Sequence, residues 1–367
     1  MRILYGVMGY GRGHAMRVAA VLPELQKRHE VWIAAGADAY QALQPRFRVE
    51  EIPTIGYAYG RGQHISPWVT IKRNLRPMHD LLVGGIGRLR LDALIRDFRP
   101  DLIISDSEAW THNAGRRWGI PRISFDHVGI MAYCRPECPP GDRLLARRDG
   151  FGYRLLMGWP ERVLISSFYP APPRDPRVEL IGPVLRDLAY QISPRAGGSL
   201  LCYLNKGAHQ FSSAFEDCLR ALPCKVKIYG TPKHGTSGNL VFKSPSEQHF
   251  LIDLASCRAV LATAGHQLLS EAIHYSKPVF ALPENCFEQR LNAHMVEKLG
   301  IGRRGDWKTL TPQVLKDFLA DSDRFDGPLA SLRSDGRQQA VTTLEKWITE
   351  LTLRPQSPVA AFKPQPA

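Results

Sequence analysis

The sequence lacks any run of about 18 apolar residues, the length that a bilayer-spanning helix needs. It also lacks the apolar stretch and small-residue cleavage site of a secretory signal peptide, because its first residues, MRILYGVMGYG, are typical of a strand that enters a glycine loop. We therefore expect a cytoplasmic protein.

Cysteine is scarce and odd in number. Seven cysteines in a chain without a signal peptide argue against a disulfide framework. Cys134 and Cys138 form a C-x3-C pair, but no second pair follows, and a structural zinc ion needs further ligands. The D-x-D at Asp321 and Asp323 lies in a polar stretch, which favours solvated surface over metal binding. We expect no metal site and no cofactor.

Nothing in the composition is extreme. The 367 residues are 44% apolar and 23% charged, which excludes a disordered, collagen-like or coiled-coil chain and allows two domains. The net charge of +13 is typical of a protein with an anionic partner, such as a nucleic acid, a lipid surface or a phosphorylated small molecule, and equally of a basic protein that is simply well solvated. No recognition helix, RNA-recognition motif or zinc finger is evident, so we expect no nucleic-acid partner.

Short apolar strands alternate with helical stretches along the chain, which predicts α/β architecture with parallel sheets covered on both faces. The predicted strands are 2–8, 30–35, 101–105, 121–125, 162–168, 199–204, 225–229, 240–243, 258–263 and 277–282. The predicted helices are 15–28, 107–118, 212–222, 247–256, 267–275, 288–299 and 337–352.

The alternation stops once, in the Pro- and Gly-containing segment 183–198, which we interpret as a linker. It separates a first domain over 1–182 from a second over 199–353, and the Pro-rich tail 354–367 is expected to be disordered. Two Rossmann-like units would present their strand ends to a common cleft, where a ligand is expected.

The first motif lies between the first strand and the first helix. Gly9, Gly11 and Gly13 allow a tight turn and a close backbone approach to a ligand, and the helix N-terminus attracts an anion. His14 opens this helix, where it could serve as a base, and Arg17 lies one turn further on.

This loop also resembles a dinucleotide fingerprint, G-x-G-x-x-G, with Asp38 placed where a ribose-binding acid would lie. His14 occupies the position of the third glycine, which weakens that interpretation. A dehydrogenase therefore stays open as the lowest-ranked alternative.

A second motif repeats the pattern of strand, glycine turn and helix in the second half. Gly265 permits close approach to a phosphate, and His266 and Gln267 open a helix whose first N–H groups lack partners. Glu271, further along that helix, could accept hydrogen bonds from a pair of sugar hydroxyls.

A third motif follows the next strand. Glu288 and Gln289 would lie at the start of a helix beside the second motif, where their side chains suit sugar hydroxyls, and Asn292 could buttress them.

Taken in order, G-x-G-x-G-H, T-A-G-H-x-x-x-S-E and E-Q-x-x-N-A resemble the motifs of GT-B nucleotide-sugar glycosyltransferases. The sequence is most similar to the MurG-like and the UDP-glucuronosyl- and UDP-glucosyltransferase-like families, and the likeness covers most of residues 1–305.

The resemblance implies a nucleotide-sugar donor held mainly by the second domain. By position, Gly265 and His266 would contact the donor phosphates and Glu271 the ribose. Glu288 and Gln289 would bind the transferred sugar, and the loop with His14 would face the acceptor and the diphosphate. Uridine is the family's usual base, although segment 242–250 does not select it over guanosine or thymidine.

The turn after residue 204 lies where the family has its second glycine loop. It contains one glycine, Gly207, where MurG-like enzymes have more, and the positive charge of Lys206 could compensate for the missing glycines in phosphate binding.

Transfer of a sugar requires a base for the acceptor hydroxyl and stabilisation of the departing diphosphate. The resemblance implies an inverting reaction that needs no metal. His14 is the first candidate for the base, and Asp106 and the pair Asp126 and His127 are alternatives, because each follows a strand of the first domain.

The first domain is expected to bind the acceptor, which the sequence does not identify and which could be a glycan or lipid-linked. Segments 57–79 and 133–159 interleave aromatic and basic residues. Such segments could meet an anionic lipid headgroup at the inner face of the membrane, or form a solvated loop face.

Two further alternatives share the same donor motifs. A nucleotide-sugar hydrolase or epimerase would use the base on water or on a sugar proton, and a non-catalytic binding protein would not need His14.

Overall fold

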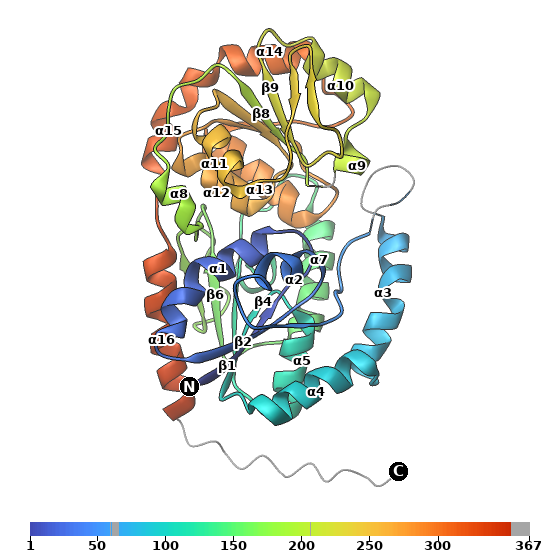
Figure 1. The fold of residues 1–367 in the computed structure, drawn as a ribbon, viewed down its shortest axis with the longest axis vertical. Coiled ribbons are helices and arrows are strands. Elements are labelled where there is room, and N and C mark those ends of the chain that lie inside the picture. The colour runs from blue at the N-terminus through green and yellow to red at the C-terminus, as the bar shows by residue number, and fades with distance from the viewer. Residues whose placement is uncertain (59, 61–65, 206, 354–367) are drawn as a thin grey trace.

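The computed structural model describes residues 1–58, 60, 66–205 and 207–353. Within these residues the chain folds into two α/β domains, each built on a sheet of seven strands (Figure 1). The predicted architecture of two Rossmann-like domains is confirmed. The predicted tail, 354–367, lies outside the described residues.

The strands of the first sheet are all parallel, and their order places β1 and β4 at its centre. Across the sheet they are β3 (Val49–Glu51), β2 (Glu30–Ala35), β1 (Arg2–Val7), β4 (Leu102–Asp106), β5 (Arg122–Asp126), β6 (Arg162–Ser166) and β7 (Val178–Ile181).

The second sheet repeats this order and is parallel except at one edge, where β10 runs antiparallel to β11. Across the sheet the strands are β10 (Gly235–Ser237), β11 (Leu240–Phe242), β9 (Val226–Tyr229), β8 (Leu200–Tyr203), β12 (Ala259–Ala262), β13 (Val279–Ala281) and β14 (Gly302–Arg304).

Helices connect the strands and cover both faces of each sheet (Figure 1). In the first half they are α1 (Gly13–Gln26), α2 (Ala37–Leu43), α3 (Pro67–Leu82), α4 (Ile86–Phe98), α5 (Ala109–Trp118), α6 (Ile130–Tyr133) and α7 (Arg143–Met157). From the linker onward they are α8 (Asp187–Gln191), α9 (Gly207–Gln210), α10 (Ser213–Arg220), α11 (Glu247–Ala255), α12 (His266–His274), α13 (Phe287–Lys298), α14 (Pro312–Ala320), η1 (Ser322–Phe325), α15 (Asp326–Ser331) and α16 (Arg337–Leu353).

Alternating residues of the central strands supply two separate cores in the first domain. Leu4 and Ile103 pack with α4 and α5 on one face, whereas Ile3 and Leu102 pack with α1 on the other. This period of two follows from the pleat of a strand, and both faces are apolar because helices cover both.

Helix α16 crosses back to the first domain. Its apolar residues Ala340, Leu344 and Trp347 belong to the core that contains α1, and α16 contacts both α1 and β4. This position differs from the predicted second domain, 199–353, which included the helix, because an amphipathic period shows that a helix has a buried face but not which sheet will cover it. The correction means that the second half of the chain helps to build the first domain.

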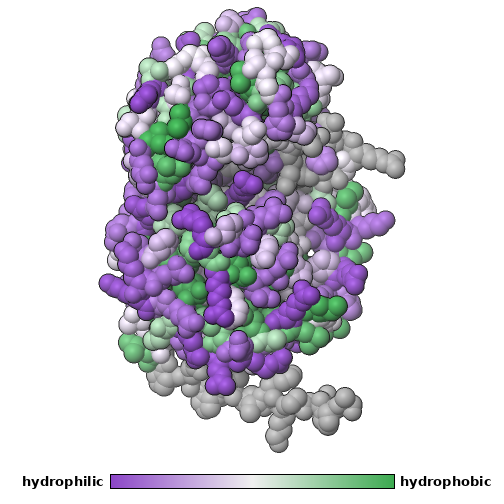
Figure 2. Space-filling model, viewed as in Figure 1, coloured by the Kyte–Doolittle hydropathy of each residue, from purple (hydrophilic) through white to green (hydrophobic). Residues whose placement is uncertain are grey.

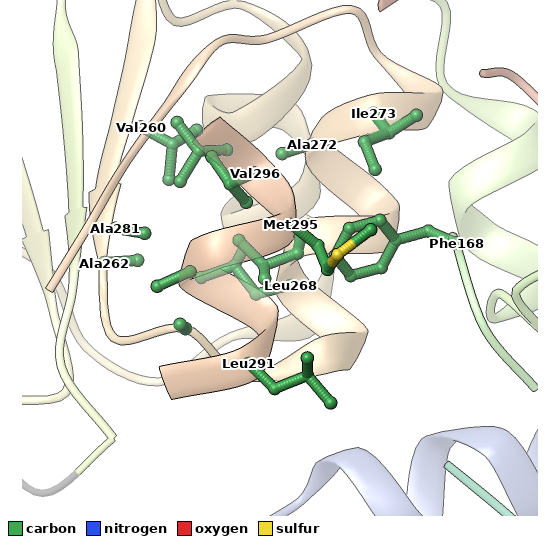
Figure 3. Packing of buried hydrophobic residues seen from close by; sticks show 14 of the residues in the cluster. Phe168, Val260, Ala262, Leu268, Ala272, Ile273, Ala281, Leu291, Met295 and Val296 are labelled. Carbon is green, nitrogen blue, oxygen red and sulfur yellow. The ribbon is translucent and has the colours of Figure 1, made fainter. Parts of the chain in front are cut away.

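The core of the second domain reaches the first domain at Phe168. Figure 3 shows this ring, which follows β6, beside Met295 of α13, with Leu268 of α12 nearby. The two domains therefore share apolar contacts next to the ends of their central strands.

Several elements carried no clear sequence signal. Strands β3, β7 and β14 are only three or four residues long, and the helices α3, α4 and α7 are not among the predicted helices. Helices α3 and α7 have apolar residues on their exposed sides, so they do not show the usual pattern of a core-facing helix.

Candidate functional site

Both sheets reverse their strand order beside a glycine turn. In the first sheet the reversal lies between β1 and β4, and in the second between β8 and β12. Crevices outside the carboxyl ends of strands at such points are where open α/β sheets bind ligands. His14 and Asp106 stand at the first crevice, and Gly207 and Gly265 at the second.

The glycine loop before α1 has little room for side chains. A Cβ atom on Gly9 would lie 2.1 Å from the Thr54 hydroxyl oxygen, and Gly11 has a φ of +80°. Asp38 accepts a hydrogen bond from the Gly11 N–H at 3.0 Å, so it fixes the loop. Gly13 faces the other domain, and a Cβ there would lie 3.4 Å from Gln267 of α12.

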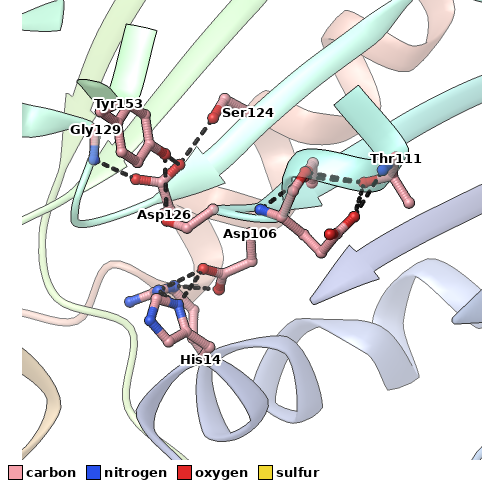
Figure 4. Close-up of polar contacts among 11 residues, drawn as sticks. His14, Asp106, Thr111, Ser124, Asp126, Gly129 and Tyr153 are labelled. Carbon is pink, nitrogen blue, oxygen red and sulfur yellow. Dashed lines mark hydrogen bonds and ion pairs between the residues drawn. The ribbon is translucent and has the colours of Figure 1, made fainter. Parts of the chain in front are cut away.

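His14, Asp106 and Arg17 form a hydrogen-bonded cluster at the end of β4 (Figure 4). The Nδ1 atom of His14 lies 2.6 Å from Asp106, and Arg17 donates to both oxygens of that carboxylate at 2.8 Å. Burial alone would raise the pKa of Asp106, but the charges of Arg17 and His14 hold it below its usual range. With Nδ1 engaged by an ionised carboxylate, Nε2 is the ring atom that can accept a proton.

Asp126, at the end of β5, has a different environment. Its carboxylate is fully buried and accepts hydrogen bonds from the Gly129 N–H and from the hydroxyls of Ser124 and Tyr153 (Figure 4). Burial and then the charge of Asp106 raise the pKa of Asp126. These contacts tie β5 to α7 and turn the side chain into the protein.

His127 and His266 stack across the boundary between the domains. Their ring centroids are 3.7 Å apart and their planes differ by 17°. Nδ1 of His127 donates to the Ser166 carbonyl at 2.9 Å, and Nε2 lies 3.0 Å from the amide oxygen of Asn292. Burial lowers the pKa of His127 to about 3 and that of His266 well below its usual value, so both rings are neutral at pH 7.

Helix α12 presents an uncapped N-terminus to the first domain. Gly265 precedes its first residue, and no side chain caps the first turn. Its unpaired N–H groups and the helix dipole give this end a positive potential. Nδ1 of His266 is buried there and has no hydrogen-bond partner among the described residues.

Glu271 is fully buried and already paired. Arg186, from the linker, donates to its two carboxylate oxygens at 2.7 and 3.0 Å, and Gln267 donates at 2.9 Å. Sequence reasoning missed Arg186, because a single arginine in a linker gives no signal of its own. The predicted ribose-binding carboxylate is therefore also the point where the linker is attached to α12.

Glu288 and Gln289 have separate surroundings. Asn292 donates to Glu288 at 2.9 Å, and burial raises the pKa of Glu288 to about 7, against the lowering effect of the nearby His14. The side chain of Gln289 instead accepts from the Glu284 N–H at 3.0 Å and donates to its carboxylate at 3.3 Å. The structure brings Glu288 within electrostatic reach of His14 and turns Gln289 toward its own loop.

Gly207 follows β8 at the second crevice. A Cβ there would lie 2.1 Å from the Gly230 carbonyl oxygen, so the turn requires glycine. Lys206, the other residue predicted in this turn, lies outside the described residues.

In the described ranges, no three His, Cys, Asp or Glu side chains are grouped as the ligands of a metal ion would be. No helix of the described part of the chain has the length and hydrophobicity to cross a bilayer.

Comparison with known proteins identifies the family of the chain. The model of the family described as glycosyl transferase family 1 matches residues 1–322. An uncharacterised glycosyltransferase of Methanosarcina mazei is 25% identical over 351 residues, which cover 88% of this chain and 89% of the relative.

Solved structures show the same GT-B arrangement. The kitacinnamycin glycosyltransferase superposes with a TM-score of 0.66 at 20% identity, covering 94% of this chain and 98% of that one. VinC, solved in complex with dTDP, gives 0.64 at 16% identity, covering 97% and 100%. MurG of Acinetobacter baumannii gives 0.59 at 13% identity, covering 94% and 99%.

Proposed function

The chain belongs to glycosyl transferase family 1, and from this premise we propose that it transfers a hexose-type sugar from a nucleoside diphosphate sugar to an acceptor hydroxyl. The reaction inverts the anomeric carbon and needs no metal ion. The observation that carries the proposal is the His14–Asp106 contact of 2.6 Å, which faces the uncapped start of α12 across the domain boundary.

In this proposal His14 is the general base. Nε2 takes the proton of the acceptor hydroxyl as its oxygen attacks the anomeric carbon. Asp106 keeps the ring oriented and stabilises the imidazolium that forms, and Arg17 keeps the carboxylate ionised. Asp126 and His127 have a structural role beside this cluster, because both are buried and hydrogen-bonded within the protein.

The departing diphosphate is stabilised by backbone and dipole. The first N–H groups of α12 donate hydrogen bonds to the leaving group and so stabilise the negative charge that develops on it, and Gly265 allows the close approach. The buried Nδ1 of His266 supports this role, since a proton there could be donated to a phosphate oxygen. The glycine loop with Gly13 lies against the same end of α12.

In this proposal two carboxylates of the second domain bind the ribose and the transferred sugar. Glu271 binds the ribose hydroxyls while it shares its charge with Arg186. Glu288, whose pKa of about 7 leaves it partly ionised at neutral pH, binds a hydroxyl of the transferred sugar beside His14. Gln289 positions this loop through Glu284.

The donor base is proposed as uridine, the usual base of the resembled families, with thymidine as the competitor that the dTDP complex of VinC suggests. A thermal-shift panel of UDP, dTDP, GDP, CDP, their sugar conjugates and NAD(P) tests this. A donor at 100-fold its dissociation constant should add about 2.7 kcal/mol to the free energy of unfolding. A response to NAD(P) alone would replace the proposal with a dehydrogenase.

Donor turnover separates a transferase from its alternatives. With the donor found by the panel, a transferase should release nucleoside diphosphate much faster once an acceptor is added, and a chelator should leave the rate unchanged. Equal turnover without any acceptor would favour a hydrolase, and interconversion of the donor sugar would favour an epimerase.

A further inference from the structure

Helix α3 has its apolar side chains on the outside. Trp68, Ile71 and Leu75 recur at helical spacing and are exposed, Trp68 by 82%. A helix on a water-facing surface normally shows the opposite arrangement, with apolar residues toward the core. The outer face of α3 therefore has the composition of a surface that is covered by something else.

The inner face of the same helix buries Leu81 in the core and is also attached by polar side chains. Asn74 donates to the Gly56 carbonyl at 2.7 Å and accepts from the Gly56 N–H at 3.1 Å. Thr70 accepts from the Ala58 N–H at 2.9 Å. These bonds fix the rotation of α3, so the apolar residues are held outward by the fold.

Helix α7 repeats the pattern. Leu144, Phe151 and Leu155 are exposed and lie on one side of the helix, where Arg147 is also exposed. Its inner side carries the buried Tyr153, which donates to Asp126. A second helix thus presents large apolar side chains to solvent.

The two helices belong to one region of the first domain. Arg148 and Asp149 of α7 both influence the pKa of Tyr57, which burial raises well above its usual value. Tyr57 lies between Gly56 and Ala58, the residues to which α3 is bound. Figure 1 draws α3 and α7 on the same side of that domain.

Positive charge accompanies the apolar residues. Lys72, Arg73 and Arg76 are exposed on α3. A surface hollow of about 430 Å³ is lined by Trp68, Val69, Lys72 and Arg73. Each of the two helices contains one acidic residue, Asp80 in α3 and Asp149 in α7. Asp149 is paired with Arg148 at 2.8 Å.

The exposed apolar residues are concentrated in this region. Of the sixteen large apolar side chains exposed among the described residues, thirteen lie between residues 68 and 159, and the others are Met1, Ile252 and Leu353. Figure 2 shows hydrophobic residues interleaved with strongly hydrophilic ones along the edge of the first domain where Figure 1 draws α3.

We propose that the outer faces of α3 and α7 form a docking surface for an anionic lipid bilayer. The apolar side chains enter the interface between headgroups and acyl chains, with Trp68 as the aromatic anchor. The lysine and arginines beside them meet the phosphates of the headgroups. A partner that offers apolar and anionic surface together matches both features of these helices.

The docking surface adjoins the site. Arg290 of α13 is paired with Asp142 at the start of α7, and α13 also carries Glu288. An acceptor anchored in the bilayer would reach the site from this side. That consequence rests on the proposed function, whereas the docking itself does not.

Vesicle co-sedimentation tests the docking without any nucleotide or acceptor. The purified chain should bind vesicles of equal parts phosphatidylcholine and phosphatidylglycerol and bind pure phosphatidylcholine far less. Binding should weaken as salt rises from about 0.1 M to about 1 M, because the screening length falls from about 10 Å to about 3 Å.

Matched variants locate the surface. Replacing Lys72, Arg73 and Arg76 with Gln should weaken binding by about fivefold for each charge removed, whereas Lys225→Gln with Lys308→Gln in the second domain should change it little. Trp68→Ser, Ile71→Ser and Leu75→Ser together should abolish binding, with Ile252→Ser as the control. These positions are exposed, so the melting temperature should stay within a few degrees of the wild type.

Three results would overturn the proposal. They are no binding to anionic vesicles, equal binding to neutral and anionic vesicles, and binding that the α3 variants leave unchanged. Self-association that the Ser variants abolish, without vesicle binding, would also overturn it and assign the surface to a second copy of the chain. All four are read without the enzymatic assay, so a failed donor panel would not affect them.

Discussion

The two domains share a strand order and differ in what they place around it. The first domain has a hydrogen-bonded cluster at its central strand ends, made by His14, Asp106 and Arg17, and it carries most of the exposed large apolar side chains. The second domain has an uncapped helix start, and between β8 and α15 it exposes a single large apolar side chain among the described residues, Ile252.

This difference shows that the two domains share the sheet as a common support, whereas the polar groups at the strand ends and the residues on the outer helix faces differ between them. The same turn of strand, glycine and helix ends in His14 in one domain and in Gly265 and His266 in the other. In the first, an ionised carboxylate engages the imidazole; in the second, the imidazole is buried and neutral. Four variants would break or sharpen this comparison.

The largest effect is expected from His14→Ala. Loss of the proposed base should lower kcat by about 10³-fold, while donor binding, which the proposal assigns mainly to the second domain, should be unchanged. Steady-state kinetics and the donor-induced thermal shift measure the two. His249→Ala, on the exposed side of α11, is the control. A kcat within tenfold of the wild type would move the base to another residue.

The second effect concerns Glu271. Glu271→Gln should cost about 3 kcal/mol of unfolding free energy, because it leaves the mostly buried Arg186 without its main partner. The double variant with Arg186→Gln should cost less than the sum of the single variants. Chemical denaturation measures this cycle.

The exposed Glu247 offers a matched control, since it lies 3.6 Å from Arg186 and Glu247→Gln should cost less than about 1 kcal/mol. Measuring donor binding separates the roles of Arg186 and Glu271. Arg186→Gln should preserve donor binding, whereas Glu271→Gln should weaken it. Equal weakening by both would make the ion pair, not the carboxylate, the element that the donor needs.

A smaller effect is expected from Arg17→Gln. The base remains in place, so kcat/KM should fall by about 10- to 100-fold, less than in His14→Ala. The loss should appear in kcat and not in the donor-induced thermal shift, because Arg17 holds the Asp106 carboxylate that orients the imidazole. Arg17→Lys should restore part of the rate. A rate equal to that of the wild type would reduce Arg17 to a purely structural role.

The smallest effect concerns stability at low pH. His112 is fully buried, and neither ring nitrogen has a partner within the described residues. Burial lowers its pKa well below the ordinary value of 6.5. Below that pH the unfolded chain binds a proton that the folded chain does not, so this group makes stability fall with falling pH.

His112→Leu removes this dependence. Relative to the wild type, it should gain about 2 kcal/mol on going from pH 7 to pH 5, from the linkage of a single proton. Urea denaturation at the two pH values measures the difference. His249→Leu, at an exposed position of the second domain, should show no such gain, and an equal gain there would remove buried His112 as the cause.

Much of this was readable from the sequence because it depends on local order. The alternation of apolar strands and helices predicted two α/β domains. The glycine turns placed His14 and Gly265 at strand ends, and the third motif placed Glu288 at the start of the helix that follows the next strand. Short strands such as β3 gave no signal, and α16 was grouped with the wrong sheet because its period does not identify its partner.

Tertiary structure decided which predicted groups meet and how they ionise. Asp106 and His14 are 92 positions apart, and only the parallel pairing of β1 with β4 sets them 2.6 Å from each other. Desolvation, which no sequence pattern reports, raises the pKa of Glu288 to about 7 and lowers that of His127 to about 3. Local order along the chain was enough to predict the fold class and to name the candidate residues, whereas sheet order and burial decided which of those residues meet and in what environment.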